Sequence, residues 1–304
     1  MRYVSFEYRD DNRRAWGISW ADKIIDLPAA GVPLDLAFPS RLIAFIREGK
    51  DAWNRIDSVI EAARTGRLRE GLLDPKAVRL LAPLPRSAKN VFALGLNYRE
   101  HAAEAGRGAN LPDVPIYFSK AATAIAAPEQ PFVLDEQVTR KLDWEIELGV
   151  VIGVGGRAIP LDQALNHVFG YTVINDLSAR DLQHGRPENQ WFLGKSLDGS
   201  CPMGPVLVST DEIPDPQQLE IALRVNGVEK QRSNTRNMIF PVAAIIADLS
   251  HYLTLEPGDV ITTGTPNGVG GARKPPEFLK SGDIVEAEIE AIGVLRTPIV
   301  GPSA

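Results

Sequence analysis

The most informative segment of this chain is Asp143-Trp144-Glu145-Ile146-Glu147-Leu148-Gly149-Val150-Val151-Ile152, whose run of apolar and β-branched residues predicts a strand. Successive side chains of a strand point to opposite faces, so Glu145 and Glu147 leave the same face, about 7 Å apart, and Asp143 shares that face. A solvated strand at the edge of a sheet also carries such charges. The pattern alone therefore leaves two interpretations open, a surface strand and a site built from carboxylates.

A second predicted strand, Gly170 to Asn175, ends directly before an acid, Asp176. An acid in this position commonly starts a turn or caps a helix. Together with Glu145 and Glu147, however, Asp176 would be the third oxygen ligand of a hard cation. Carboxylates without Cys or His suit Mg²⁺, Mn²⁺ or Ca²⁺ rather than Zn²⁺, and three protein ligands on an octahedral ion leave positions for water and a chelating substrate.

Two other segments carry groups suited to acid–base chemistry. His101 and Glu104 are three residues apart and share a face if the segment is helical. A carboxylate beside an imidazole orients it and raises its basicity, as in a general base for water. Lys195 ends an apolar run, and the Gly-Lys-Ser around it lacks the earlier glycine of a phosphate loop. A surface histidine and a surface lysine are the competing interpretations.

Two glycine-rich segments are candidate ligand-binding loops. Gly153 to Ala158 fits the dinucleotide pattern, with Asp176 about 20 residues further on. Pro160 follows at once, and the helical pattern at 161–168 is too short for a crossover helix, so we favour a turn over a nucleotide fold. The segment 262–271 is predicted to be a turn or a backbone-amide cradle for a carboxylate.

The organisation around these motifs favours short strands over helices. A predicted hairpin at 3–20 and predicted helices at 41–48 and 52–65 precede the prolines at 75, 83 and 85. We therefore expect a small N-terminal domain at 1–75 and a larger domain at 76–304. The larger part contains strand patterns bounded by Gly and Pro, and helical patterns only at 98–105, 161–168 and 241–253. This distribution disfavours a barrel of repeated strand–helix units.

Composition narrows the class of partner. The chain has 304 residues, and its 39 acidic against 33 basic residues give a formal charge of −6, which argues against nucleic acid. The single cysteine, Cys201, excludes an intrachain disulfide and a multi-cysteine metal site. No apolar run reaches the roughly 18 residues of a spanning helix, and the first residues lack the core of a signal peptide. We therefore expect a cytoplasmic protein that does not bind a membrane.

Together these segments resemble the fumarylacetoacetate hydrolase family over roughly residues 90 to 300. The shared motifs are Gly95-Leu96-Asn97-Tyr98 with His101 and Glu104, Asp143 to Gly149, Asn175-Asp176 with Ser178 to Asp181, Gly194-Lys195-Ser196 with Cys201 to Pro205, and Thr263 to Pro266 with Gly268 to Gly270. Each motif alone is weak, but their common order is specific. The resemblance implies an α+β, mainly β fold, a mixed β-sandwich roll with a small N-terminal α+β domain. It also implies a homodimer that holds Mg²⁺ or Mn²⁺, with Ca²⁺ as a substitute in a crystal.

The resemblance also implies roles for single residues. Glu145, Glu147 and Asp176 match the metal ligands. His101 and Glu104 match a water-activating pair on a lid segment, and Lys195 matches a lysine that steadies an oxyanion. Gln183 and Thr265 match positions that contact the substrate. The Gly-rich stretch 105–114 of the lid matches least well.

The activity implied by the resemblance is metal-dependent hydrolysis of a carbon–carbon bond in a 2,4-dioxo acid of the acylpyruvate or fumarylpyruvate type, in aromatic catabolism. The substrate would be a small anionic 2-oxo acid. His101 and Glu104 favour hydrolysis, because water must be activated there. Alternatives on the same site are decarboxylation of an oxaloacetate-type acid and isomerisation or hydration of a 2-hydroxy-dienoate. An NAD-binding oxidoreductase, resting on Gly153 to Ala158, is a distant alternative. A non-catalytic metal binder would lack His101, Glu104 or Lys195.

Overall fold

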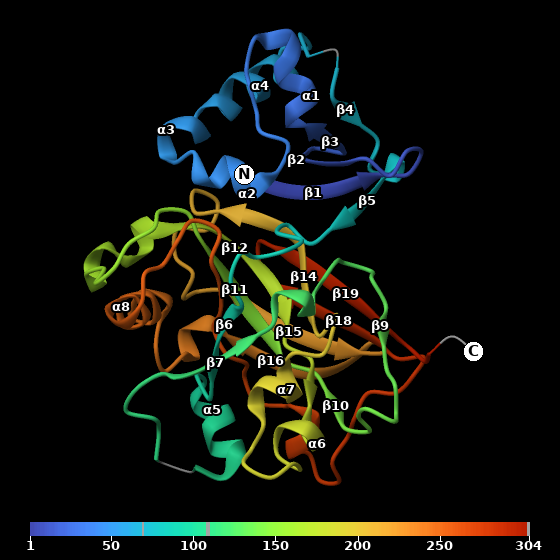
Figure 1. Cartoon of the computed structure of the whole chain (residues 1–304), viewed down its shortest axis with the longest axis vertical. Coiled ribbons are helices and arrows are strands. Elements are labelled where there is room, and N and C mark those ends of the chain that lie inside the picture. Colours follow the sequence, from blue (N-terminus) through green and yellow to red (C-terminus); the bar gives the residue numbers. More distant parts are fainter. Residues whose placement is uncertain (69, 108–109, 303–304) are drawn as a thin grey trace.

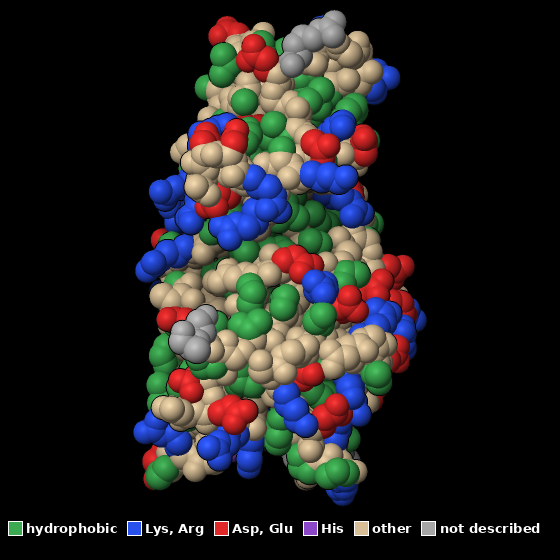
Figure 2. Space-filling view, turned by 90° about the vertical axis from the view of Figure 1, so that its right-hand side faces the viewer, with side chains coloured by type: hydrophobic (Ala, Val, Ile, Leu, Met, Phe, Trp, Pro, Cys, Tyr) green, Lys and Arg blue, Asp and Glu red, His purple; other side chains and the backbone are tan. Residues whose placement is uncertain are grey.

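The structure is a computed structural model that describes residues 1–68, 70–107 and 110–302. The molecule is elongated, with the N-terminal segment at one end and a larger part below it (Figure 1). Lys and Arg side chains gather in a band where these two parts meet on the face in Figure 2. Among the helices of the described residues, none is long and apolar enough to cross a bilayer.

The elements of the N-terminal part begin with the predicted hairpin, which is confirmed: β1 pairs antiparallel with β2, and Tyr3 lies opposite Ile18. The strands of this part are β1 (Arg2–Tyr8), β2 (Arg14–Trp20), β3 (Lys23–Asp26), β4 (Leu72–Leu73) and β5 (Val78–Leu81). Its helices are α1 (Leu27–Gly31), α2 (Leu42–Arg47), α3 (Lys50–Trp53) and α4 (Arg55–Arg64), with 3₁₀ turns at Val32–Leu34 and Pro75–Ala77.

The prediction of a single helix at 52–65 is wrong at its start, where the chain forms two separate helices. Asn54 separates α3 from α4, and the Trp53 ring packs edge-to-face against Phe169 with the ring centroids 4.8 Å apart. The buried face of α4 is formed by Ile56, Val59, Ala62 and Ala63, at the spacing of a helix that covers a sheet.

The remaining elements follow from Val91 onward. The strands are β6 (Val91–Gly95), β7 (Ile116–Lys120), β8 (Ile125–Ala126), β9 (Phe132–Val133), β10 (Leu142–Asp143), β11 (Ile146–Ile152), β12 (Val168–Asn175), β13 (Ser178–Ala179), β14 (Cys201–Ser209), β15 (Glu220–Val225), β16 (Val228–Asn234), β17 (Val260–Thr262), β18 (Ile284–Ile289) and β19 (Gly293–Val300). The helices are α5 (Arg99–Ala102), α6 (Arg180–Gln183), α7 (Trp191–Lys195) and α8 (Val242–Tyr252). A π-helical turn spans Ala103–Arg107, and 3₁₀ turns span Ala122–Ala124, Leu161–His167, Thr235–Asn237 and Gly270–Ala272.

Two sheets make up most of the fold. The larger is a 12-stranded mixed sheet with the order β4-β3-β2-β1-β14-β12-β11-β17-β6-β7, in which β5 also pairs with β1 and β8 with β14. It runs without interruption from the N-terminal part into the larger part through the pairing of β1 with β14. The second sheet has five strands in the order β16-β15-β18-β19-β9. The expected boundary near residue 75 falls between β4 and β5 and stays a prediction.

The two sheets pack on a shared apolar core, which confirms the predicted α+β, mainly β sandwich. Ile146, Leu148 and Val150 of β11 belong to the same buried cluster as Leu223 of β15 and Val285 of β18. Alternation along the strand sends Glu145, Glu147 and Val151 to the opposite face. There Val151 joins a second cluster that includes core residues of the N-terminal part.

The pairing of β11 with β12 explains where the acidic residues meet. The strands are antiparallel and Ile146 lies opposite Asn175, so the start of β11 adjoins the end of β12. The amide of Asp176 donates to the carbonyl of Glu145 at 2.8 Å. The short helices α5, α6 and α7 lie together at this end of the larger part, away from the N-terminal part (Figure 1).

The Gly153 to Ala158 segment is a turn, as predicted. It is followed by a 3₁₀ turn, Leu161–His167, and not by a crossover helix. The backbone of Gly156 pairs with Leu255. The segment therefore lacks the helix N-terminus on which a dinucleotide pyrophosphate rests.

Candidate active site

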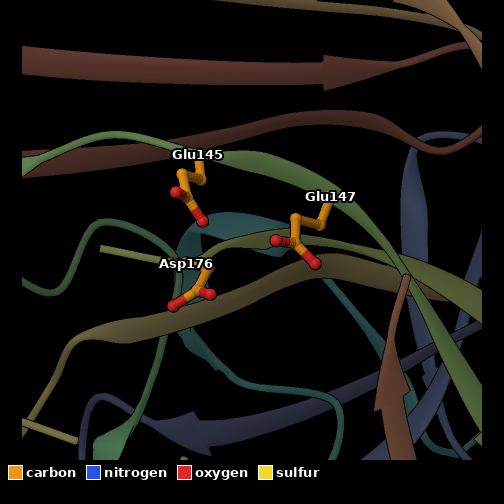
Figure 3. A group of neighbouring side chains, drawn as sticks. All are labelled: Glu145, Glu147 and Asp176. Carbon is orange, nitrogen blue, oxygen red and sulfur yellow. The ribbon is translucent and has the colours of Figure 1, made fainter. Parts of the chain in front are cut away.

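Three carboxylates converge at the junction of β11 and β12. Glu145, Glu147 and Asp176 offer oxygen atoms that all lie within 4.8 Å of one another. Glu145, directly before β11, and Glu147 within it lie next to Asp176, which directly follows β12 (Figure 3). Glu147 and Asp176 are fully buried and Glu145 is 5% exposed, which excludes the surface-strand interpretation.

The hydrogen bonds and the raised pKa of Glu147 indicate that this group of acids is suited to bind a cation. Its Oε2 accepts hydrogen bonds from the Thr262 hydroxyl and from the Gly264 amide, the latter at 2.6 Å. Its buried Oε1 has no partner. Burial, followed by the charges of Asp176 and Glu145, raises the pKa of Glu147 well above its ordinary value. A divalent cation among these oxygens would satisfy the free atom and offset the repulsion, and an all-oxygen donor set suits Mg²⁺ or Mn²⁺.

Lys195 bridges two members of the triad. Its Nζ donates to Glu145 Oε2 at 2.6 Å and to Asp176 Oδ2 at 2.7 Å. Burial alone would raise the pKa of Glu145, but Lys195 and Arg180 together hold it below its ordinary value. An ammonium group has three donors, so one N–H of Lys195 remains for a ligand in the cavity.

His101 and Glu104 form the expected pair. His101 Nδ1 lies 3.2 Å from Glu104 Oε2, so Nε2 is the ring nitrogen left for a substrate or water. The two oxygens of Glu104 also accept from the Gly268 amide at 3.0 and 3.1 Å. This contact fixes the segment of α5 and the π-helical turn against the 263–271 loop. The lid stretch 105–114 lies partly outside the described residues, because 108 and 109 are not described.

The 263–271 loop is an amide cradle, as one of our two interpretations held, but the carboxylates that it binds belong to the chain itself. Gly264 donates to Glu147 and Gly268 to Glu104. The amides of Gly270 and Gly271 donate to Asp143 at 2.6 and 2.9 Å. These amides therefore fix the acidic groups of the site, and a substrate carboxylate needs other partners.

Asp143 shares the strand face of Glu145 but does not join the triad. It accepts from Arg180 Nε at 2.8 Å as well as from the loop amides. Arg180 in turn donates from its Nη2 to Glu145 Oε1 at 2.6 Å. Asp143 thus orients the guanidinium that orients Glu145.

Gln183 and Thr265 line the same cavity, although nothing in the structure tests their predicted contact with substrate. Gln183 Oε1 accepts from Arg180 Nη1 at 2.9 Å, which leaves its amide NH₂ group. The Thr265 hydroxyl donates to the Ile146 carbonyl and accepts from the side chain of Gln231, both at 2.9 Å. Each side chain is therefore held in place by the protein.

Lys120 and Arg180 are the residues of this site that sequence reasoning missed. Lys120 is fully buried and donates to Asp176 Oδ1 at 2.5 Å and to the carbonyls of Leu177 and Lys195. A lysine at the end of a strand is normally exposed. Arg180 belongs to the Ser178 to Asp181 motif, but its partners Asp143 and Glu145 lie far from it in sequence.

The candidate catalytic groups line one cavity of about 890 Å³. Its polar wall contains His101, Glu104, Glu145, Glu147 and Lys195. Its apolar wall contains Leu94, Phe118, Trp191, Val269 and Phe278. Such a volume and such a division of the walls are typical of a site for a small organic ligand held by a few polar contacts.

A β-sandwich that buries an acidic triad beside a histidine–glutamate pair is the architecture of a family of enzymes. The chain belongs to the fumarylacetoacetate hydrolase family. The family model described as fumarylacetoacetate (FAA) hydrolase C-terminal matches residues 90–300, as the resemblance in the sequence implied.

Individual relatives cover nearly the whole chain. The oxaloacetate tautomerase fahd2 of Xenopus laevis mitochondria is 41% identical over 302 residues, which is 99% of this chain and 90% of that protein. The oxaloacetate tautomerase YisK of Bacillus subtilis is 42% identical over 282 residues, which is 91% of this chain and 93% of that protein. A solved fumarylacetoacetate hydrolase from Exiguobacterium antarcticum has a TM-score of 0.84 at 36% identity and covers 99% of this chain and all of its own.

A further solved structure contains bound ligands. Maleylpyruvate hydrolase from Sphingobium, in complex with manganese(II) and pyruvate, has a TM-score of 0.77 at 27% identity over the full length of both chains. That neighbour holds a metal and a 2-oxo acid together. Its fold is the fold of this chain.

Proposed function

We propose that this chain is a divalent-metal-dependent enzyme that interconverts the enol and keto forms of an oxaloacetate-type 2-oxo acid. The observation that carries the proposal is that His101, Lys195, Glu145 and Glu147 face one cavity, with an oxygen of Asp176 within 4.8 Å of oxygens of both glutamates. Tautomerisation needs only the movement of protons next to an activated carbonyl. The names of the relatives from Xenopus laevis and Bacillus subtilis support this reaction over the hydrolysis that we expected from the sequence.

Glu145, Glu147 and Asp176 would hold the ion, Mg²⁺ or Mn²⁺. A divalent cation bound there supplies Lewis-acid polarisation of the substrate carbonyl. Arg180 and Lys120 keep Glu145 and Asp176 oriented through their hydrogen bonds at 2.6 and 2.5 Å. The buried triad is thereby preorganised before a substrate binds.

The proton transfer is assigned to His101. Glu104 fixes the ring through Nδ1, so Nε2 faces the cavity as an acid–base group. It takes a proton from C3 of the keto acid, or returns one to C3 of the enol. Lys195 donates its free N–H to the C2 oxygen, where negative charge develops when the C3 proton leaves. In the keto-to-enol direction His101 takes one proton from C3 and the C2 oxygen gains one from the Lys195 ammonium, and exchange with solvent restores both side chains. The enol-to-keto direction reverses both transfers, and no bond between heavy atoms breaks.

Hydrolysis of an acylpyruvate is the second candidate, and the same histidine–glutamate pair favours it. His101 Nε2 could take a proton from water instead of from C3, and maleylpyruvate hydrolase shares the fold. Decarboxylation of an oxaloacetate-type acid, the alternative from the sequence, requires no attacking water. The small anionic substrate and the homodimer stay predictions.

Three assays on one preparation separate these reactions. The decay of the enol absorbance of oxaloacetate reports tautomerisation, release of carbon dioxide reports decarboxylation, and loss of the dioxo absorbance of an acylpyruvate reports hydrolysis. We expect the first to be fastest with Mg²⁺ or Mn²⁺ and to vanish with a chelator. Faster acylpyruvate cleavage than enol decay, per enzyme, would contradict the proposal and establish the hydrolase.

A further inference from the structure

The cationic side chains of the main cavity are not equivalent. Those that line it among the described side chains are His101, Lys141, Arg180, His184 and Lys195. A cation that is already paired with a protein carboxylate has little left to offer an anionic ligand. The partners of each cation therefore decide which one is available to bind the substrate.

Two of the cations are committed to the protein. The three donor nitrogens of Arg180 bind Asp143, Gln183 and Glu145 at 2.8, 2.9 and 2.6 Å. Two of the three N–H groups of the Lys195 ammonium bind Glu145 and Asp176 of the triad. In the proposed mechanism the third N–H group binds the reacting end of the substrate.

Neither histidine supplies a free positive charge. His101 is paired with Glu104. Burial, followed by the nearby charge of Arg180, lowers the pKa of His184 below its ordinary value, so its ring is neutral at physiological pH. His184 also packs edge-to-face on Trp191 in the wall of the cavity, with ring centroids 5.9 Å apart.

Lys141 is the remaining cation of this set. Its side chain is exposed, and among the described residues no carboxylate lies within ion-pair distance of it. Its backbone is fixed directly before β10: its amide donates to the Thr139 hydroxyl at 3.2 Å and its carbonyl accepts from the Arg180 amide at 3.0 Å. The side chain therefore starts from a defined point and reaches the cavity through flexible methylene groups.

The charge of the centre argues for a ligand with two negative groups. The buried cluster contains four carboxylates and three cations, which are Asp143, Glu145, Glu147, Asp176, Lys120, Arg180 and Lys195. With all groups ionised the cluster has a charge of −1, and a divalent ion would bring it to +1. One carboxylate of a 2-oxo acid offsets that charge. A second carboxylate would have no counterpart at the centre, and among the described side chains of the cavity wall Lys141 is the cation without a carboxylate partner.

We propose that Lys141 binds the distal carboxylate of the substrate and gives this site its preference for 2-oxo dicarboxylates over monocarboxylates. The proposal rests on the proposed function for the position of the 2-oxo acid end. Lys141 is thus a specificity-determining residue, and it does not take part in the proton transfer.

The test compares ligands that differ only in the distal carboxylate. Oxaloacetate and 2-oxobutanoate are the substrate pair, followed by exchange of the C3 protons for deuterium by NMR. Malate and 2-hydroxybutanoate are the non-reacting pair, followed by calorimetry on the Mn²⁺-loaded protein. The variants are Lys141→Met, which keeps the apolar stem, and Lys141→Arg, which keeps the charge. Lys280→Met is the control, because Lys280 is also exposed but lines a different cavity.

The expected result is a selective loss. Removing one partly exposed charge-assisted hydrogen bond should raise the KM for oxaloacetate and the Kd of malate roughly tenfold, with kcat nearly unchanged. The values for 2-oxobutanoate and 2-hydroxybutanoate should stay as in the wild type. Lys141→Arg should recover most of the oxaloacetate KM, and Lys280→Met should change nothing.

Equal effects of Lys141→Met on both members of a pair, or no effect on either, would overturn the role of Lys141. Failure of the proposed function is a different result, in which the wild type exchanges the C3 protons of neither acid. In that case the malate comparison still tests the carboxylate contact. Wild-type protein that binds 2-hydroxybutanoate as tightly as malate would also reject the proposal.

Discussion

The ammonium group of Lys120 lies 2.5 Å from Oδ1 of Asp176, and neither side chain is exposed to solvent. Lys120 also donates to the Lys195 carbonyl, so one buried cation joins a proposed metal ligand to the end of the helix that carries Lys195. A buried charge without a partner is costly, and the lysine therefore serves both the fold and the shape of the site.

Lys120→Met should destabilise the protein strongly, because it leaves Asp176 buried with one of its two cationic partners missing. Breaking a buried pair by removing one partner typically costs about 3–5 kcal/mol in the free energy of unfolding. Urea denaturation of the metal-free protein checks the value. The double variant Lys120→Met with Asp176→Asn should recover part of the loss, since the unpaired charge is then gone. Additive losses in the double variant would mean that the two residues are not coupled.

Glu147→Gln should have opposite effects on stability and on metal binding. The amide oxygen can still accept from Thr262 and Gly264, while the NH₂ group would replace the unpartnered oxygen and face the other acids. The metal-free variant should therefore melt at or above the wild-type temperature, because a repulsive buried charge is removed. Stabilisation by Mn²⁺ should disappear.

Differential scanning calorimetry with and without Mn²⁺ checks both halves of this prediction. Glu136→Gln is the control, because Glu136 is an exposed acid outside the main cavity. An undiminished Mn²⁺-dependent rise in Tm for Glu147→Gln would remove Glu147 from the set of ligands.

The strands and the acids at their ends could be predicted from local pattern, but their meeting point could not. Glu145 and Asp176 meet because Ile146 pairs with Asn175, and that register is a long-range contact that no periodicity encodes. The family resemblance supplied the grouping instead. The same limit explains Lys120, whose partner Asp176 is 56 residues away, and whose burial is tolerated only because that partner is present.

The backbone contacts of the loops also could not be predicted from the sequence. Gly268 and Glu104 are 164 residues apart, and the sequence predicted a cradle at 262–271 without indicating which carboxylates it holds. Strand β14 runs from Cys201 to Ser209 and contains two prolines. Pro202 and Pro205 break the usual signature of a central strand, although tertiary pairing with β12 holds the segment extended.

Stability at high pH should depend on Tyr8. Burial and the hydrogen bond to Asp26 raise the pKa of Tyr8 to about 12. The folded state therefore keeps this proton when the unfolded chain, with the ordinary pKa near 10, has lost it. The contribution of Tyr8 is fully present below pH 10 and declines as the pH rises from about 10 to about 12. Tyr8→Phe should make the free energy of unfolding fall less steeply in this window.

The comparison requires denaturation curves at several pH values between 8 and 12 for wild type and variant. Tyr252→Phe is the control, because Tyr252 is 69% exposed. Parallel pH profiles for wild type and Tyr8→Phe would show that the phenol loses its proton equally in the folded and unfolded states.

His101→Ala should separate the reactions that this site could perform. Loss of a positioned acid–base group typically slows proton transfer by about 10²- to 10⁴-fold, so tautomerisation and hydrolysis should both collapse. Decarboxylation of oxaloacetate needs no proton to be taken from water or from C3, and it should survive if the site catalyses it. Mn²⁺ affinity should be unchanged, because His101 is not among the three carboxylates proposed to bind the ion. Glu104→Gln should cause a smaller loss, since the amide can still accept from Gly268 but no longer carries the charge that supports the imidazolium. A His101→Ala variant with wild-type enol decay would assign the proton transfer to another group in the cavity, with the neutral His184 as the first candidate.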